Sequence, residues 1–584
     1  MNAANRTGFF LKEKAPWPIF LFILFVPFFV VAFIGFDPHH DGLILTTIRE
    51  LKVVIQNGGP WPFNQYGPSW VLPFLVMSYL VPSNFLFFYI RFLVVVFYFL
   101  SAYILFRTAQ KFLSKALAHL TIAIFLISQP FSAQLSSDLI PWPSAFAMLM
   151  TSAMFAFYVI KTQSENGRYQ KLSTLCIGLV LPWIIASRIQ VGGLLLVSAV
   201  LLVSRKSPRT ELLWLTSGFF FSGFAITFFL FCKGWLYQAF TDQVIFGSVY
   251  VRGDTTTYPK PYWTVIGSFG FFMLFLFFPR LIRLVGEKRK KMIFVFVASF
   301  FVLILAIFLQ KVLLRRGLVG VDQFVILSRR VWICLTLAAL VFAFFNHLRD
   351  SIKNQKLRID PSKEFLIQRA LLLISIAAES QIYPLFDQMH FWWGSLPAVL
   401  VLSQILRSRI YLPLASLGIK RNFLLCVIVG IGVLSLFPLY SNLQEKRDAF
   451  PRSISHALFV YPSQARNERN LQHFFNSYLH RGERVLNLCS NSNVFFVADR
   501  YRSSTRLFVY WYPFELIPQY RKEYQSSRES AIITCTINQV AIFAKATEAR
   551  KSAIVNEKFR HPELVASYVD SQGMEWKIFR DTKS

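Results

Sequence analysis

Long apolar runs recur along the first three quarters of the chain, separated by short polar stretches. A helix needs about 20 apolar residues to cross a hydrocarbon core about 30 Å thick, and these runs approach that length. They therefore predict membrane-spanning helices. Trp17–Phe36 also has no small-x-small cleavage site, so we expect it to remain as the first span rather than to be removed as a signal peptide. The clearest runs are Trp17–Phe36, Phe85–Phe106, Leu212–Phe231, Met292–Leu309 and Phe423–Tyr440.

The pattern changes after Tyr440, where charges of both signs mix and short β-type stretches alternate with amphipathic segments. An apolar period of two predicts strands, and a period near 3.6 predicts helices. We expect residues 1–440 to form a helical membrane domain and residues 441–584 a soluble α/β domain. The predicted strands are Arg484–Cys489, Asn493–Ala498, Ala531–Thr536, Gln539–Ala544 and Glu575–Arg580, and the predicted helices are Ser463–Leu479 and Phe514–Tyr524.

Composition agrees with a membrane protein. Of the 584 residues, 55% are hydrophobic and 17% aromatic, and 64 are phenylalanine, which is more apolar surface than a soluble domain of ordinary composition carries. The formal net charge is +31. The Lys and Arg residues lie mostly in short loops between apolar runs rather than on one soluble face, which argues against nucleic acid as a partner.

Seven basic clusters set the predicted topology. If all seven are cytoplasmic, they alternate with the opposite loops across every intervening pair of spans, as the positive-inside rule requires. About 13 spans result, with the N-terminus cytoplasmic and the C-terminal domain outside. The clusters are Arg6/Lys12/Lys14, Arg107/Lys111/Lys115, Lys161/Arg168/Lys171, Arg205/Lys206/Arg209, Arg280/Arg283 with Lys288 to Lys291, Arg349/Lys353/Lys356/Arg358 and Arg407/Arg409/Lys420/Arg421.

One apolar segment is too short to be a span. Ser69–Val81 contains Pro73, and counting it as a span would place the cluster around Lys111 outside. We therefore expect an interfacial or re-entrant helix. It would lie within a long first external loop that runs from Asp37 to about Asn84.

The six cysteines divide into two groups. Cys489 and Cys535 both lie in the C-terminal domain, each next to a predicted strand. A disulfide between them is expected only if the compartment oxidises thiols, so the sequence leaves their state open. The other four lie in apolar runs and are expected to be small packing residues: Cys176, Cys232, Cys334 and Cys426.

Two carboxylates and two histidines follow the first predicted span, at Asp37, His39, His40 and Asp41. A partly desolvated carboxylate in this position can take the proton from an attacking hydroxyl. The alternative is structural: Asp37 before Pro38 can start a turn, and Asp41 can cap a helix that begins near Gly42. The residues by themselves leave both interpretations open.

A second acid and histidine, Asp387 and His390, lie three residues apart on the predicted outer side. This spacing places them on one face of a helix or turn, where they can bind sugar hydroxyls or orient a phosphate. The alternative is a polar helix end between two spans. Asp138 is a third acid on the predicted outer side.

Three arginines are candidates for binding a phosphate on that side. Arg91 lies about two turns into a predicted span, where a charge is costly and usually has a purpose. Arg188 and Arg330 lie at external span ends. Arginine suits phosphate because its planar fork donates two parallel hydrogen bonds. The alternative for each is snorkelling to lipid headgroups.

The first-loop motif resembles that of a known enzyme family. Asp37 and Asp41-Gly42 after the first span, followed by Tyr66-Gly67-Pro68, resemble the first-loop signature of bacterial membrane glycosyltransferases of the GT-C superfamily. These are similar in plan to the lipid A aminoarabinose transferases and the family 39-like protein O-mannosyltransferases. The stretch 381–390, which ends in Asp387 and His390, resembles their Pro-x-x-Asp-x-x-His stretch.

The resemblance implies that a first-loop aspartate is catalytic. Asp41 is the leading match and Asp37 the second, because relatives carry Asp-Glu where this chain has His40-Asp41. The family moves a sugar from a polyprenyl-phosphate donor to a hydroxyl of a lipid, glycan or protein acceptor at the outer face of the bacterial inner membrane. No cofactor is required, although Asp37, Asp41 and Asp138 together can hold a divalent cation through oxygen ligands.

Three alternatives remain: a transporter, a transferase with a different donor, and a scaffold. A transporter or flippase of lipid-linked sugars usually has internal repeats and charges near the bilayer midplane, whereas this chain shows no repeat and its acids cluster at the predicted outer face. An O-antigen polymerase or ligase would use a diphosphate donor. A non-catalytic scaffold does not account for the long first loop.

Overall fold

The computed structural model describes the chain in segments that include most of the predicted helices. They are residues 40–64, 66–82, 85–113, 143–204, 207–246, 319–357, 361–382, 388–405, 454–455, 458–459, 462–489, 502–503, 518–536, 551–571 and 573–582, with single residues at 118, 121, 122 and 125. The predicted spans Trp17–Phe36, Met292–Leu309 and Phe423–Tyr440 lie outside these segments, as do the predicted strands Asn493–Ala498 and Gln539–Ala544.

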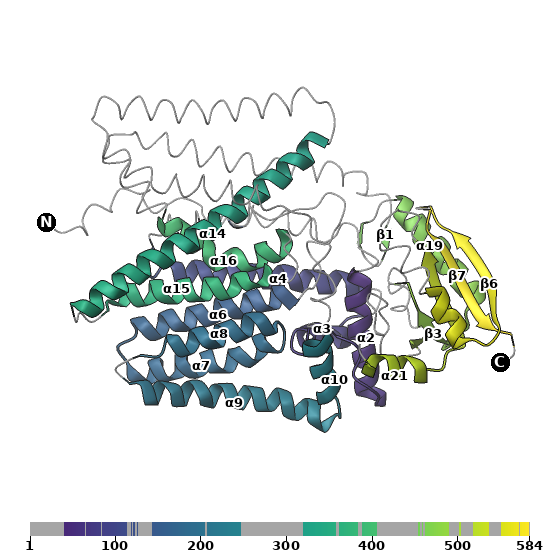
Figure 1. Ribbon diagram of the computed structural model, residues 1–584, viewed down its shortest axis with the longest axis horizontal. Coiled ribbons are helices and arrows are strands. Elements are labelled where there is room, and N and C mark those ends of the chain that lie inside the picture. Colours follow the sequence, from purple (N-terminus) through teal and green to yellow (C-terminus); the bar gives the residue numbers. More distant parts are fainter. Residues whose placement is uncertain are drawn as a thin grey trace.

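The first described part of the structure is a bundle of apolar helices that lie side by side (Figure 1). Three of the described helices, α4, α6 and α9, are long and apolar enough to cross a membrane. Two of them, α4 and α9, confirm the predicted spans Phe85–Phe106 and Leu212–Phe231, and the chain is an integral membrane protein. The bundle helices are α4 (Leu86–Ala109), α6 (Pro143–Gln163), α7 (Gly167–Ile185), α8 (Ile189–Leu201), α9 (Pro208–Cys232), α14 (Val319–Lys356), α15 (Lys363–Glu379) and α16 (Gln388–Ile405).

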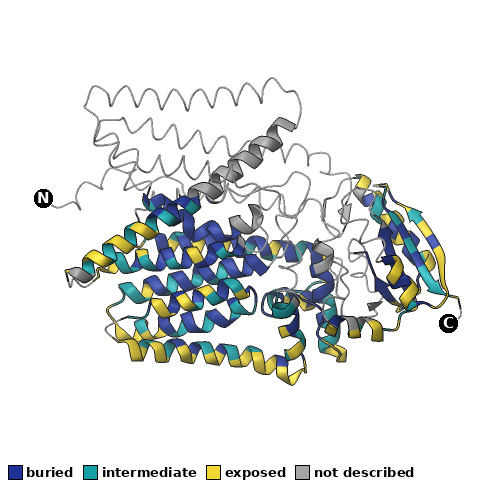
Figure 2. Ribbon diagram, viewed as in Figure 1, coloured by how far each residue is buried: buried dark blue, intermediate teal, exposed yellow. Residues whose placement is uncertain are grey.

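Helix α9 packs on α7 through glycine and presents its phenylalanines to the outside (Figure 2). A Cβ atom on Gly178 would lie 2.2 Å from the carbonyl oxygen of Leu215, and one on Gly218 would lie 2.3 Å from that of Leu175. Such close backbone approach is typical of helix pairs in lipid. On the opposite side of α9, Phe221 is 75% exposed, as expected of a helix that faces hydrocarbon.

Two shorter helices, α2 (His40–Asn57) and α3 (Val71–Leu80), belong to the predicted first loop. Figure 1 shows α2 lying across one end of the bundle rather than along it. The ten residues of α3 confirm the predicted short helix, which is well below the length of a span. Lys52 of α2 donates to the carbonyl of Ser78 in α3 at 2.8 Å.

Of the two interpretations left open for Asp41, the helix-cap alternative does not fit the structure. Asp41 has helical backbone within α2, whereas an N-cap residue lies outside the helix with non-helical dihedral angles. The helix extends further toward the N-terminus than the Gly42 start that we expected. Asp41 therefore lies in the first described turn of α2 and is not its cap.

The second described part is an α/β domain built on a five-stranded sheet of order β4-β3-β5-β7-β6. Strand β3 pairs parallel with β4 and β5, and β7 pairs antiparallel with β5 and β6. Strands β3 (Arg484–Asn487), β5 (Ala531–Thr536) and β7 (Glu575–Asp581) confirm three predictions, as does α19 (Pro462–Tyr478). Helix α21 (Pro518–Ser526) agrees with the C-terminal half of Phe514–Tyr524. The elements not predicted are β1 (Ile454–Ser455), β2 (Leu458–Phe459), β4 (Arg502–Ser503) and β6 (Pro562–Val569).

A disulfide joins Cys489, just after β3, to Cys535 in β5, with a Cα–Cα distance of 5.4 Å. The parallel pairing of β3 with β5 brings the two cysteines together. The bridge closes a loop of 46 residues and resolves the question that the sequence left open. In the other group, Cys176 and Cys232 are free cysteines of the bundle. Cys176 is half-buried, whereas Cys232 is exposed and does not have the packing role that we expected.

Candidate functional site at one end of the helix bundle

The first loop is seated directly on the end of α7. Ser69 donates its backbone N–H to the carbonyl of Ala186 at 3.1 Å and its hydroxyl to the carbonyl of Trp183 at 2.6 Å. Gly67 has φ of +93°, and a Cβ atom there would lie 2.4 Å from the Ala186 oxygen. Only glycine fits that conformation and that space, which gives the Tyr-Gly-Pro motif a structural reason for its glycine.

Asn64 fixes the shape of the same loop. Its amide nitrogen donates to the carbonyl of Gly67 at 2.6 Å, and its amide oxygen accepts from the backbone N–H of Tyr66 and from the indole of Trp70, both at 3.1 Å. Asn64 is buried. A buried amide with three bonds holds one conformation, because each lost bond would leave a desolvated polar group.

Arg188 lies buried beneath this loop, at the N-terminal end of α8. Its Nε and Nη2 donate to the hydroxyl of Ser144 in the first turn of α6, at 3.1 and 2.7 Å. Its guanidinium carbon lies 5.0 Å from the centre of the Tyr66 ring, within cation–π range. The buried position argues against simple snorkelling to headgroups, which was the alternative for Arg188.

The segment after α9 covers the other side of the loop. It contains α10 (Leu236–Phe240) and a π-helical turn, η4 (Thr241–Phe246). Gln238 accepts from the N–H of Trp61 at 2.7 Å, and Gln243 donates to the carbonyl of Ile185 at 2.8 Å. Asp242 is completely buried and accepts from the N–H of Asn64 at 3.1 Å. π-Helical turns of this kind are often found at functional sites.

A buried carboxyl group lies at the same end of the bundle, at Glu379 where α15 ends. Helix α15 runs antiparallel to α8: Arg369 bonds to the carbonyl of Leu201, and the next turn, η5 (Ser380–Ile382), contacts α8. In the described part of the chain, neither carboxyl oxygen of Glu379 has a hydrogen-bond partner, and neither does Oε1 of Gln381. Three buried acceptor atoms near α8 therefore have no donor among the described residues.

An open apolar groove starts beside this site. It lies between α7 and α9 and has a volume of about 730 Å³. Ile185 and Ala186 line one part of it, and Phe220 and Phe224 of α9 line another. Ala186 is also the residue that accepts from Ser69 of the loop, so the groove reaches the seat of the first loop.

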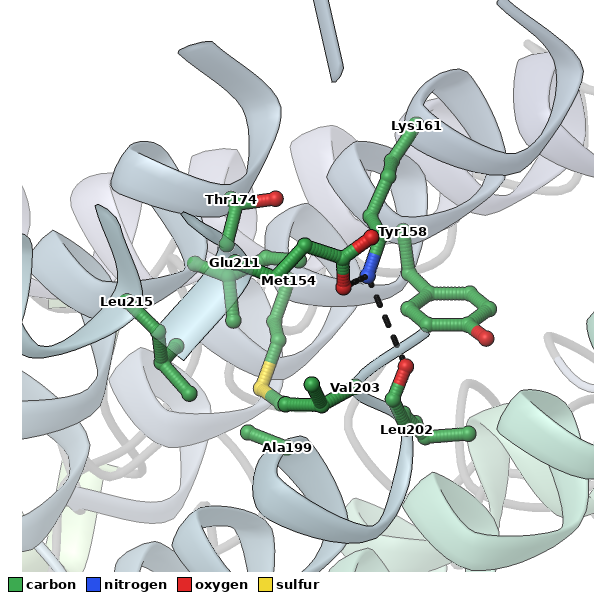
Figure 3. Close-up of a pocket in the computed structure, with 10 residues that line it drawn as sticks. Met154, Tyr158, Lys161, Thr174, Ala199, Leu202, Val203, Glu211 and Leu215 are labelled. Atoms are coloured by element: carbon green, nitrogen blue, oxygen red, sulfur yellow. Dashed lines mark hydrogen bonds and ion pairs between the residues drawn. The ribbon is translucent and has the colours of Figure 1, made fainter. Parts of the chain in front are cut away.

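The opposite end of the bundle holds a different kind of charge cluster (Figure 3). Lys161, in the last turn of α6, forms an ion pair of 2.5 Å with Glu211 of α9. Glu211 also accepts from the N–H of Ser204 at 2.9 Å. The cavity around this pair has only about 10 Å³, room for about one water molecule. Ser144 and Lys161 lie about 25 Å apart along α6, at 1.5 Å per residue.

The residues predicted for the site are therefore only partly located by the structure. Arg188 lies in it, and Arg91 is buried in α4. Asp41, Arg330 and His390 lie in α2, α14 and α16. Asp37, Asp138 and Asp387 lie outside the described residues. Within the described segments, no three His, Cys, Asp or Glu side chains are grouped to hold a metal ion.

Asp242, Glu379 and Tyr520 are functional candidates that the sequence analysis missed. The sequence could have identified Glu379, since it is an acid at the end of an apolar run. No sequence pattern marks Asp242 or Tyr520, because the importance of each comes from contacts with residues far away in the chain.

Comparison with known proteins gives similarity in structure but not in sequence. No family model matches the chain, and no curated protein matches its sequence. It is similar to the Archaeoglobus fulgidus oligosaccharyltransferase in the apo form, with a TM-score of 0.47 and 11% identity over 89% of this chain and 70% of that one. It is also similar to ArnT from Cupriavidus metallidurans bound to undecaprenyl phosphate, with a TM-score of 0.43 and 11% identity over 97% and 98%.

A third structure is archaeal AglB from Archaeoglobus fulgidus in complex with an inhibitory peptide and a dolichol-phosphate. Its TM-score is 0.45, with 9% identity over 89% of this chain and 70% of that one. These proteins belong to the GT-C superfamily, the class that the first-loop motif resembles.

Proposed function

We propose that this protein is a glycosyltransferase that moves a sugar from a polyprenyl-phosphate donor to an acceptor hydroxyl at the outer face of the membrane. The main support is one arrangement: the first loop lies on a buried arginine, and an apolar groove begins beside it. A polyprenyl phosphate has one anionic end and one apolar end, so its chemistry matches the arginine and the groove.

The groove between α7 and α9 would hold the first isoprene units of the donor. It faces the outside of the bundle, where α9 exposes Phe220, Phe221 and Phe224. A lipid tail could enter sideways from the bilayer without crossing a polar barrier. Arg188 would neutralise the phosphate as it leaves, with Arg91 and Arg330 as further candidates.

The chemical step is a displacement at the anomeric carbon. The acceptor oxygen forms a bond to that carbon, the bond from the carbon to the phosphate oxygen breaks, and the configuration inverts. Asp41, with Asp37 as the second candidate, takes the hydroxyl proton as general base. Polyprenyl phosphate leaves with the electron pair of the broken bond, and its negative charge is stabilised by arginine.

Other predicted residues would complete this site. Asp387 and His390 would bind sugar hydroxyls or orient the phosphate. Asp138, with Asp37 and Asp41, supplies the oxygen ligands that a divalent cation would need, and the proposal holds with or without such an ion. The acceptor is a lipid, glycan or protein hydroxyl, and the membrane is the bacterial cytoplasmic one.

Reconstituted protein tests the proposal. Proteoliposomes are supplied with a radiolabelled polyprenyl-phosphate sugar and a membrane extract from the source organism as acceptor. We expect label to leave the donor and to appear in a larger product, with release of free polyprenyl phosphate. Movement of intact donor between leaflets, with no loss of its sugar, would contradict the proposal and support a transporter instead.

A further inference from the structure

The C-terminal domain contacts the first loop through one buried carboxylate, Asp242. The hydroxyl of Tyr520, in α21, donates to Oδ1 of Asp242 at 2.6 Å. The other oxygen, Oδ2, accepts from the backbone N–H of Asn64 in the first loop. Asp242 and Tyr520 are both completely buried. Figure 1 shows α21 beside α2 and α10, at the face of the bundle that carries the first loop.

The Tyr520 ring adds a second contact with the same loop. It meets Phe63 edge to face, with ring centres 5.9 Å apart and planes at 85°. Aromatic pairs favour this geometry because the positive edge of one ring meets the negative face of the other. Tyr520, more than 400 positions later in the chain, thus contacts the first loop directly at Phe63 and, through Asp242, at the neighbouring Asn64.

A continuous series of contacts leads from Tyr520 to Arg188. Tyr520 bonds Asp242, Asp242 bonds the N–H of Asn64, and the side chain of Asn64 bonds the N–H of Tyr66. The Tyr66 ring lies over Arg188. Gln243, next to Asp242, ties the same loop to the end of α7 through the carbonyls of Tyr66 and Ile185.

We propose that Asp242 and Tyr520 are positioning residues through which the C-terminal domain holds the first loop on Arg188. A buried carboxylate is stabilised by each donor that it keeps. The loop supplies a donor to one oxygen of Asp242, and the C-terminal domain supplies a donor to the other. Loss of either contact removes a bond to a desolvated acceptor, so the domain and the loop favour one shared arrangement.

Hydrogen exchange on the full-length protein in nanodiscs tests this coupling without measuring transfer. Tyr520→Phe removes only the hydroxyl. We expect exchange in the peptide spanning residues 61–70 to rise about 10- to 100-fold, because a bond to a charged acceptor is lost. Peptides from β3 and β5 should keep their protection, which would show that the C-terminal domain remains folded.

The control is Tyr568→Phe. Tyr568 lies in β6 of the same domain and stacks on Phe474, and its hydroxyl makes no hydrogen bond in the described residues. Tyr568→Phe should leave hydrogen exchange in the first loop unchanged. Asp242→Asn combined with Tyr520→Phe should loosen the loop little more than Asp242→Asn does, since both changes break one contact. Unchanged exchange in Tyr520→Phe, or equal loosening in Tyr568→Phe, would overturn the proposal.

The consequence for catalysis rests on the proposed function. If the protein is a transferase, Tyr520→Phe should lower kcat/KM about 10-fold, while Tyr568→Phe retains the wild-type value. A loosened loop with wild-type transfer would show that the contact is structural and would refute a positioning role. Absence of transfer in the wild-type protein would refute the proposed function, and the exchange result would still decide the coupling.

Discussion

Two glutamates at opposite ends of the bundle have different surroundings. Glu211, at the end marked by Lys161, is half-buried and has an ion pair with that lysine and a bond from the Ser204 N–H. Glu379, at the end marked by Arg188, is buried and has no hydrogen-bond partner in the described part of the structure. Of the two, only Glu211 has described protein groups that replace the water lost when the helices packed.

The two surroundings fit different roles under the proposed function. A half-buried ion pair with bonds on both members can hold helices together, and the cavity around Lys161 has no room for a ligand. A buried carboxyl group is costly unless it meets a donor, so Glu379 is a candidate to meet a ligand, water or proton in the proposed reaction. Under the proposed function, the Arg188 end carries the chemistry and the Lys161 end contributes stability.

The largest expected effect is at Asp41. Asp41→Asn should reduce kcat about 10²- to 10⁴-fold, because asparagine keeps the shape but cannot accept the hydroxyl proton. A purely structural role in the first turn of α2 would cost only about 0.3–1 kcal/mol, too little to cause such a loss. Transfer from a radiolabelled polyprenyl-phosphate sugar measures it, with folding checked by size-exclusion chromatography.

Asp37→Asn should be measured in the same transfer assay, since Asp37 and Asp41 are both candidates for the general base. Near-normal turnover in Asp41→Asn together with collapse in Asp37→Asn would move the base four residues upstream. Normal turnover in both variants would show that the first loop supplies no base, and the Arg188 end would lose its assignment.

The next effect concerns stability at the Lys161 end. Lys161→Met leaves the half-buried Glu211 without its cation and should cost about 1–3 kcal/mol of folding free energy. Lys161→Met combined with Glu211→Leu should recover most of that loss. The thermal unfolding midpoint in nanodiscs reports both. Turnover per folded molecule should stay near the wild-type value. A variant that remains stable but turns over poorly would show that the Lys161 end also takes part in function.

A smaller effect is expected at Arg188. Arg188→Lys keeps the charge but loses the two-nitrogen contact with Ser144 and the flat contact with Tyr66. We expect kcat/KM to fall about 10- to 100-fold. Lys161→Arg is the matched change at the other end and should leave kcat/KM almost unaltered. Equal losses in the two variants would mean that the assay reports general stability rather than the site.

The smallest expected effect is a change in stability that has opposite signs for the two glutamates. Glu379→Gln removes an ionisable group that has no hydrogen-bond partner among the described residues, and it should raise stability by about 1 kcal/mol at the expense of turnover. Glu211→Gln removes half of an ion pair and should lower stability. Differential scanning fluorimetry of the two variants under one condition compares them directly. A lower midpoint in Glu379→Gln would show that this carboxyl stabilises the fold after all.

Sequence patterns predicted the parts of this structure that depend on local periodicity. Strand β5 was predicted with its observed bounds, and α4, α9, α19, β3 and β7 were predicted within a few residues. Strand β6 was missed because it lies at the edge of the sheet: it begins with Pro562, and Ala566 is its only buried residue. An edge strand needs little apolar alternation.

The site was less predictable because its bonds join distant segments. Arg188 was found because an arginine at the end of an apolar run is unusual. Asp242 lies 178 residues from Asn64 and 278 from Tyr520, and no local pattern reveals such partners. The start of α2 was misplaced because Asp41 is a good N-cap residue by type, while the helix already includes it.

In the proposed function the donor lies at the Arg188 end, with its tail between α7 and α9. Photo-crosslinking with a polyprenyl phosphate that carries a diazirine on its first isoprene unit tests this position. We expect label in peptides covering residues 182–186 and 219–227, which line the groove, and loss of that label when unmodified polyprenyl phosphate competes. Label on Leu202, Val203 or Leu215 around the Lys161 pair, with none in the groove, would contradict it.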